Sequence, residues 1–237
     1  MESKEQQDSL AQSEIQPNRV QELVEKQQNL DNTRDAVNKT GDALGMEIDV
    51  GIKETVVLLK ALGIPTTASC EGHTKDGLPW PWVEIAAENE PEERWENQNS
   101  IFEVIAQKYN MSVADVKSPN MDTINVWQEA MITSSKNPET KEYQKRAEEN
   151  RKLYAQVSEH LNEFYKTRDS KMKVSLEKFA GDIFRISCRG ESEDMAQKFI
   201  RDDITEDELK EFNRKLPEKQ TEMREFTKFL ENRYWEG

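Results

Sequence analysis

The chain has 237 residues, of which 35% are hydrophobic and 34% are charged. A chain of this kind can form one core of moderate size with solvated helices around it, and a second full domain is not expected. Its 33 basic and 47 acidic residues give a net charge of −14, which opposes binding to nucleic-acid phosphates and to anionic membranes.

Residues 1–16 are polar and rich in Gln, Glu and Ser, and we expect them to form a disordered tail without the apolar core of a signal peptide. No run approaches the roughly 18 apolar residues of a membrane span. We therefore expect a soluble, cytoplasmic protein, in which the two cysteines are free thiols or ligands before they are a disulfide.

Residues 17–45 form an N-terminal helical segment in this prediction, because their apolar residues recur at loose helical spacing. Residues 46–237 are expected to be a single α+β domain: a small, mainly antiparallel sheet of about four strands, wrapped by helices. A long, charged, mostly helical insertion occupies about 88–173. Its longest helix, near 138–170, carries a narrow apolar seam that would also suit self-association through the long helices.

The most core-like stretch runs from Asp49 to Ala87. Asp49 is placed to cap a helix that ends at Gly63. A strand over Thr66 to Cys70 follows, then a turn, and a second strand over Trp80 to Ala87.

Further elements are predicted along the chain from apolar spacing and turn residues. They are a helix opening at Pro91, a turn of helix near Ser112, a helix from Met121, a β-hairpin of Val174–Phe179 and Ile183–Cys188, helices capped by Ser192 and by Thr205 with Glu208, and a last helix opening at Pro217.

The turn Cys70-Glu71-Gly72-His73 is the candidate site, since functional groups commonly lie on loops that a rigid sheet positions. Two strands end alike, in Ser69-Cys70 and in Ser187-Cys188. If those strands are neighbours, both thiols and His73 converge, and Cys70, His73 and Cys188 form a candidate zinc set with Glu71, Glu84 or water as fourth ligand.

Other interpretations of this turn stay open. Cys70 can be a nucleophile activated by the imidazole, with Glu71 and His73 as acid and base. In a purely structural interpretation, the cysteines are small buried hydrophobes and His73 is an exposed turn histidine. The remaining candidate ligand-binding residues are Ser69, Gly72, Trp82, Cys188 and Asp49.

The segments Thr66–His73 and Phe184–Gly190 resemble two blocks of the tRNA methyltransferase domain of wybutosine synthesis, and the first also resembles uncharacterised bacterial proteins with the Ser-Cys-Glu-Gly-His motif. The resemblance implies a sheet-and-cleft scaffold and S-adenosylmethionine as the cofactor. Ser69, Cys70 and Gly72 match the family's turn, whereas Glu71 and His73 replace its Ser and Arg. The lost arginine removes positive charge that an RNA phosphate would need.

Three functions follow as expectations. The first is a ligand-binding domain or small-molecule enzyme with a cleft built on the Ser-Cys-Glu-Gly-His turn. The second is an S-adenosylmethionine-dependent RNA methyltransferase, and the third is a helical protein-interaction module with a vestigial cleft. The sequence does not decide whether the protein is an enzyme.

Overall fold

The computed structural model describes residues 17–40, 47–74, 78–189, 198 and 203–236. Over these residues the protein is α+β, as predicted, with about 59% helix and 11% strand and with a four-stranded antiparallel sheet. The expected tail over 1–16 and the helix expected after Ser192 lie outside the described residues. In the part that is described, no helix is both long and apolar enough to cross a membrane.

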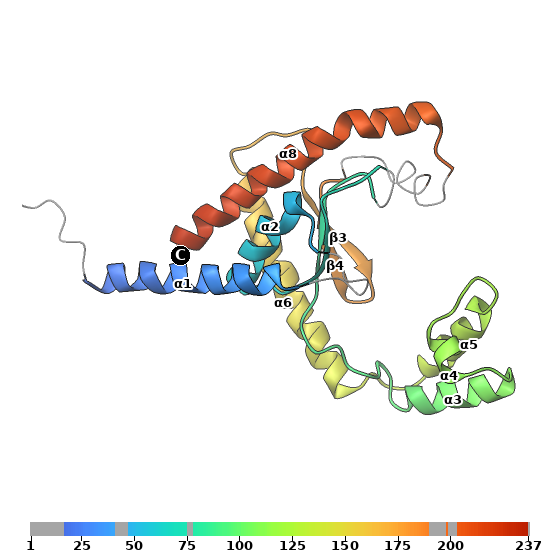
Figure 1. Ribbon diagram of the computed structural model, residues 1–237. Coiled ribbons are helices and arrows are strands. Elements are labelled where there is room, and N and C mark those ends of the chain that lie inside the picture. The colour runs from blue at the N-terminus through green and yellow to red at the C-terminus, as the bar shows by residue number, and fades with distance from the viewer. Residues whose placement is uncertain (1–16, 41–46, 75–77, 190–197, 199–202, 237) are drawn as a thin grey trace, which may run out of the picture. The chain divides into compact units, whose positions relative to one another are not determined.

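The elements follow the predicted order with some changed bounds (Figure 1). They are α1 (Pro17–Asn38), α2 (Val50–Ala61), β1 (Thr66–Cys70), β2 (Trp82–Ile85), α3 (Gln98–Lys108), α4 (Val113–Lys117), α5 (Ile124–Ser134), α6 (Lys141–Tyr165), β3 (Ser175–Ala180), β4 (Ile183–Ser187) and α8 (Glu206–Glu236).

The chain divides into two compact units. The first comprises Met1–Glu84, His160–Glu177 and Arg185–Gly237, and the second comprises Ile85–Glu159 and Lys178–Phe184. The insertion expected at about 88–173 is therefore shared, since its last part belongs to the first unit.

The core of the first unit is built on α2. Ile52 and the run Val56 to Leu59 are fully buried, because α2 packs against α1 on one side and α8 on another. Met223, Phe226 and Leu230 supply the buried face of α8. On α1, Leu30 and Val37 are buried, whereas the apolar side chains near its start are exposed.

The second unit has its own apolar cluster and one buried ion pair. Phe102, Ile105 and residues of α4 and α5 form the cluster. The guanidinium of Arg146, a residue of α6, donates to the carboxylate of Asp182, which lies between β3 and β4. The distance is 3.1 Å, and both side chains are largely buried. This pair fixes the tip of the β3–β4 hairpin, where Gly181 has a φ of +56°.

The sheet order is β1-β2-β4-β3. The hairpin of β3 and β4 was predicted correctly, including its glycine turn. Strand β2 is shorter than predicted, but its alternation is as expected: Val83 and Ile85 are fully buried, and Trp82 and Glu84 on the other face are half-buried.

Two helix starts were predicted wrongly. Residues 91–97 are not helical, because Arg94 and Glu96 bond to the chain around Pro138 through backbone hydrogen bonds of 2.9 Å, and α3 begins only at Gln98. Pro217 opens no helix and lies inside α8. The helix continues through the proline, at the cost of one backbone hydrogen bond, because apolar residues on both sides of it are buried.

The capping box at the start of α8 is confirmed. The Glu208 carboxylate accepts from the Thr205 backbone N–H at 2.9 Å, and the Thr205 hydroxyl accepts from the Glu208 N–H at 3.3 Å. This box fixes the beginning of the helix that later lines the candidate site.

Candidate functional site

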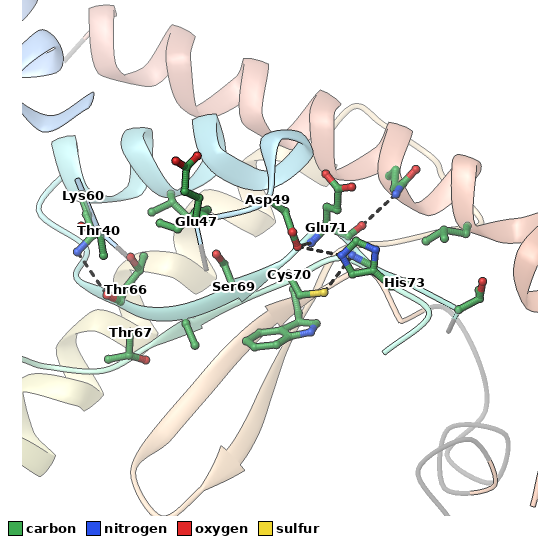
Figure 2. A pocket seen from close by; sticks show the side chains of 18 residues that line it. Thr40, Glu47, Asp49, Lys60, Thr66, Thr67, Ser69, Cys70, Glu71 and His73 are labelled. Carbon is green, nitrogen blue, oxygen red and sulfur yellow. Dashed lines mark hydrogen bonds and ion pairs between the residues drawn. The ribbon is translucent and has the colours of Figure 1, made fainter. Parts of the chain in front are cut away.

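A pocket of about 970 Å³ opens along β1 and the turn that follows it. It lies entirely within the first unit, and Figure 2 shows its lining side chains. The lining residues are Thr40, Glu47, Ile48, Asp49, Val56, Lys60, Thr66, Thr67, Ala68, Ser69, Cys70, Glu71, Gly72, His73, Thr74, Trp82, Leu216 and Gln220. The predicted Ser-Cys-Glu-Gly-His turn is thus part of a concave surface.

Three chemically reactive side chains meet at one end of this pocket. Asp49, Cys70 and His73 each offer one oxygen, sulfur or nitrogen atom, and these atoms lie within 4.8 Å of one another. His73 Nε2 is 3.1 Å from the Asp49 carboxylate, and both side chains remain about one third exposed. Figure 2 shows the Asp49 side chain directed toward the His73 ring, with the Cys70 sulfur beside them.

Asp49 and Glu71 exchange the roles expected for them. Asp49 stands at the N-cap position of α2, as predicted, but its side chain makes no capping bond there. It accepts instead from the Glu71 backbone N–H at 3.0 Å, while the Glu71 carboxylate accepts from the Gly51 N–H at 2.6 Å. Glu71 therefore satisfies one backbone N–H in the first turn of α2, and the Asp49 carboxylate is left to interact with His73 and Cys70.

Gly72 allows the turn to lie against the chain before β2. Its φ is +92°, and a Cβ built there would lie 2.8 Å from the Trp80 carbonyl carbon and 2.9 Å from Leu216 Cδ1. No other residue type combines this backbone conformation with so close an approach. The His73 N–H donates to the Leu78 carbonyl at 2.9 Å.

The electrostatic surroundings of Cys70 disfavour its thiolate. Burial raises the pKa of the Cys70 thiol, and the negative charges of Asp49 and Glu71 raise that pKa further. The Gly72 N–H, which donates to the sulfur at 3.3 Å, acts in the opposite direction. A nucleophilic cysteine needs a lowered pKa, so the arrangement does not favour that interpretation.

Ser69 and Trp82 line the pocket as expected. The Trp82 ring lies 4.0 Å from the Arg185 guanidinium carbon, and Arg185 is itself bonded to Glu84 at 2.9 Å. Trp80 is buried against Phe212 and is a core residue.

Cys188 lies apart from the group of Asp49, Cys70 and His73. Its side chain is fully buried, its thiol donates to the Met172 carbonyl at 3.2 Å, and burial raises its pKa to about 12. Strand β2 separates β1 from β4, so two strand spacings, about 10 Å, stand between the two cysteines. Cys188 is absent from the pocket lining given above. Asp49 lies beside Cys70 and His73, in the position that was predicted for Cys188.

Sequence reasoning missed the contribution of α8. The Gln220 amide donates to the Glu71 carbonyl at 3.1 Å, and Leu216 packs near Gly72. Gln220 lies 149 residues beyond Glu71, and no spacing or motif links it to the turn.

Gly72→Ala should destabilise the protein more than Gly63→Ala. Both glycines have positive φ, but a Cβ at Gly63 would meet nothing within 4 Å. Gly63→Ala should therefore lower the free energy of unfolding only by the cost of holding an alanine at positive φ, about 1–2 kcal/mol. Gly72→Ala should lower it by that cost and by a steric clash of about 1–3 kcal/mol in addition. Urea denaturation of both variants measures the two free energies of unfolding, and equal losses would show that the close approach at Gly72 does not exist.

Cys70 should alkylate slowly at neutral pH. In a Cys188→Ala background it is the remaining thiol of the chain. Its raised pKa means that little thiolate is present at pH 7, so the rate with iodoacetamide should rise only above the free-cysteine midpoint of about 8.5. Asp49→Asn removes a negative charge and should move the midpoint down. In the Cys188→Ala protein with Asp49 intact, a midpoint at or below the free-cysteine value would contradict the geometry.

Comparison of the whole chain with protein-family models, with curated proteins and with solved structures finds no match. The resemblance to the wybutosine-synthesis domain stays a prediction.

Proposed function

We propose that the pocket along β1 binds a small polar molecule that is uncharged or positively charged, and that Asp49, Cys70 and His73 contact it. The observation that carries this proposal is the convergence of three reactive side chains in the wall of an open pocket of about 970 Å³. Small-molecule sites typically have this size and contain a few convergent polar groups.

The charge of the lining supports the class of ligand. Glu47, Asp49 and Glu71 are acidic, and Lys60 is the one lysine or arginine among the described lining residues. The Lys60 ammonium donates to the Thr66 carbonyl at 3.3 Å, at the opposite end of β1 from Cys70 (Figure 2). At about 3.3 Å per residue the strand separates the two ends by roughly 13 Å. The end that holds Cys70 and His73 therefore attracts positive charge.

The same charges do not favour the RNA methyltransferase. An RNA phosphate is held by lysine and arginine, and carboxylates beside it repel it. If the turn is matched to that family as the expected resemblance implies, His73 replaces an arginine and Glu71 replaces a serine.

The seam on α6 offers little support for the interaction module. Its apolar residues Val157, Leu161 and Phe164 are buried within the chain, so they present no continuous apolar stripe to a partner.

A thermal-shift screen of the full chain tests the proposal. The library contains uncharged, cationic and anionic metabolites, with S-adenosylmethionine and nucleotides among them, in a buffer with a metal chelator. A compound present at 100 times its Kd should stabilise the protein by about 2.7 kcal/mol. We expect the stabilising compounds to be uncharged or cationic.

Asp49→Asn should reduce that stabilisation, because it removes the carboxylate that faces the ligand. Asp207→Asn is the matched control, since Asp207 is a highly exposed carboxylate in the first turn of α8, far along the helix from Gln220. Stabilisation by anionic compounds alone, or stabilisation that Asp49→Asn leaves unchanged, would refute the proposal.

A further inference from the structure

We propose that Asp49, Cys70 and His73 bind one zinc ion in the pocket, with a fourth coordination position left open to water or to a neutral oxygen or nitrogen atom of the ligand. This inference deepens the proposed function, because it rests on the same pocket and names the ion that would hold the ligand there. Oxygen, sulfur and nitrogen donors together are a set that zinc accepts, whereas magnesium and calcium take oxygen ligands almost exclusively.

The geometry requires little movement of the three side chains. Zinc bonds of about 2.0–2.3 Å in a tetrahedral arrangement place neighbouring ligand atoms about 3.3–3.6 Å apart. The three donor atoms already lie within 4.8 Å of one another, and His73 Nε2 is 3.1 Å from Asp49 Oδ2. A small opening of the Asp49–His73 contact and a small approach of Cys70 would produce the coordination distances.

Hydrogen bonds from the backbone hold two of the three donors in place. The Glu71 N–H donates to Asp49 Oδ2, and the Gly72 N–H donates to the Cys70 sulfur. Such partners orient metal ligands and stabilise their charged forms. On binding, Cys70 coordinates as the thiolate, and its proton passes to the solvent.

The fourth position is open because the carboxylates considered for it have other partners. The Glu71 carboxylate accepts from the Gly51 N–H at 2.6 Å, and Glu84 pairs with Arg185 at 2.9 Å and accepts from the Thr67 hydroxyl at 2.8 Å. Cys188, two strands away, is held by the Met172 carbonyl. Three protein ligands and an open position are the arrangement of zinc sites that work on bound molecules, whereas structural sites use four protein ligands.

The test is metal binding by the purified, tag-free full chain after treatment with a chelator. Competition with a chromophoric zinc indicator should give about one zinc per chain. Cobalt in place of zinc should give a thiolate-to-cobalt charge-transfer band, which reports coordination by a cysteine directly.

Each of Cys70→Ala, His73→Ala and Asp49→Asn should lower zinc affinity at least about 100-fold, since even partners that only orient a ligand are worth 10–100-fold. Cys70→Ala should also abolish the charge-transfer band. Cys188→Ala is the matched cysteine control and should keep both the affinity and the band. Circular dichroism of each variant shows whether it is folded. If either alanine variant is unfolded, Asp49→Asn, which nearly preserves the side-chain volume, tests the same site.

Absence of stoichiometric zinc in the wild type, or wild-type affinity in Cys70→Ala, would overturn the zinc site. These failures differ from a failure of the proposed function. The ligand screen is run with a chelator and again with zinc. If a ligand binds in the chelator buffer and the wild type binds no zinc, the proposed function stands and the zinc site is refuted. If zinc binds but no compound binds in either screen, the zinc site stands and the proposed small-molecule function is refuted.

Discussion

The candidate site depends on the exchange of hydrogen bonds between Asp49 and Glu71. The Asp49 carboxylate accepts from the Glu71 N–H, and the Glu71 carboxylate accepts from the Gly51 N–H. These two bonds tie the beginning of α2 to the turn after β1, and both are charge-assisted, which makes each roughly twice as strong as a neutral bond. Because the N-terminus of a helix favours negative charge, Glu71 also occupies the most favourable place for its carboxylate.

The fold was largely predictable from the sequence, because each strand or helix carries a local signal. The alternation in Trp82 to Ile85, the glycine turn at Gly181 and the capping box of Thr205 with Glu208 are all interactions within a few residues. The errors occur where distant partners decide the structure. Residues 91–97 bond to the chain near Pro138, and buried apolar residues carry α8 through Pro217.

The site was predictable only in part, for the same reason. The turn from Ser69 to His73 was located by its residue types, and Asp49 was selected as a nearby carboxylate. The order of strands is a long-range property, so sequence alone placed Cys188 in the site although β2 stands between β4 and β1. Gln220 was missed because it reaches the turn from a helix 149 residues away.

In the Ser-Cys-Glu-Gly-His motif, some residues form the turn and others present reactive groups to the pocket. Gly72 permits the close approach to Trp80, and Glu71 caps α2, so both are explained by folding. The two together direct Cys70 and His73 toward Asp49, which lies more than twenty residues earlier in the chain. The motif's structural members bring a thiol and an imidazole to a carboxylate, and no lysine or arginine is close by among the described lining residues, which supports the proposed binding of a cation. The excess negative charge that disfavours RNA at this turn is thus the property that a zinc ion would neutralise.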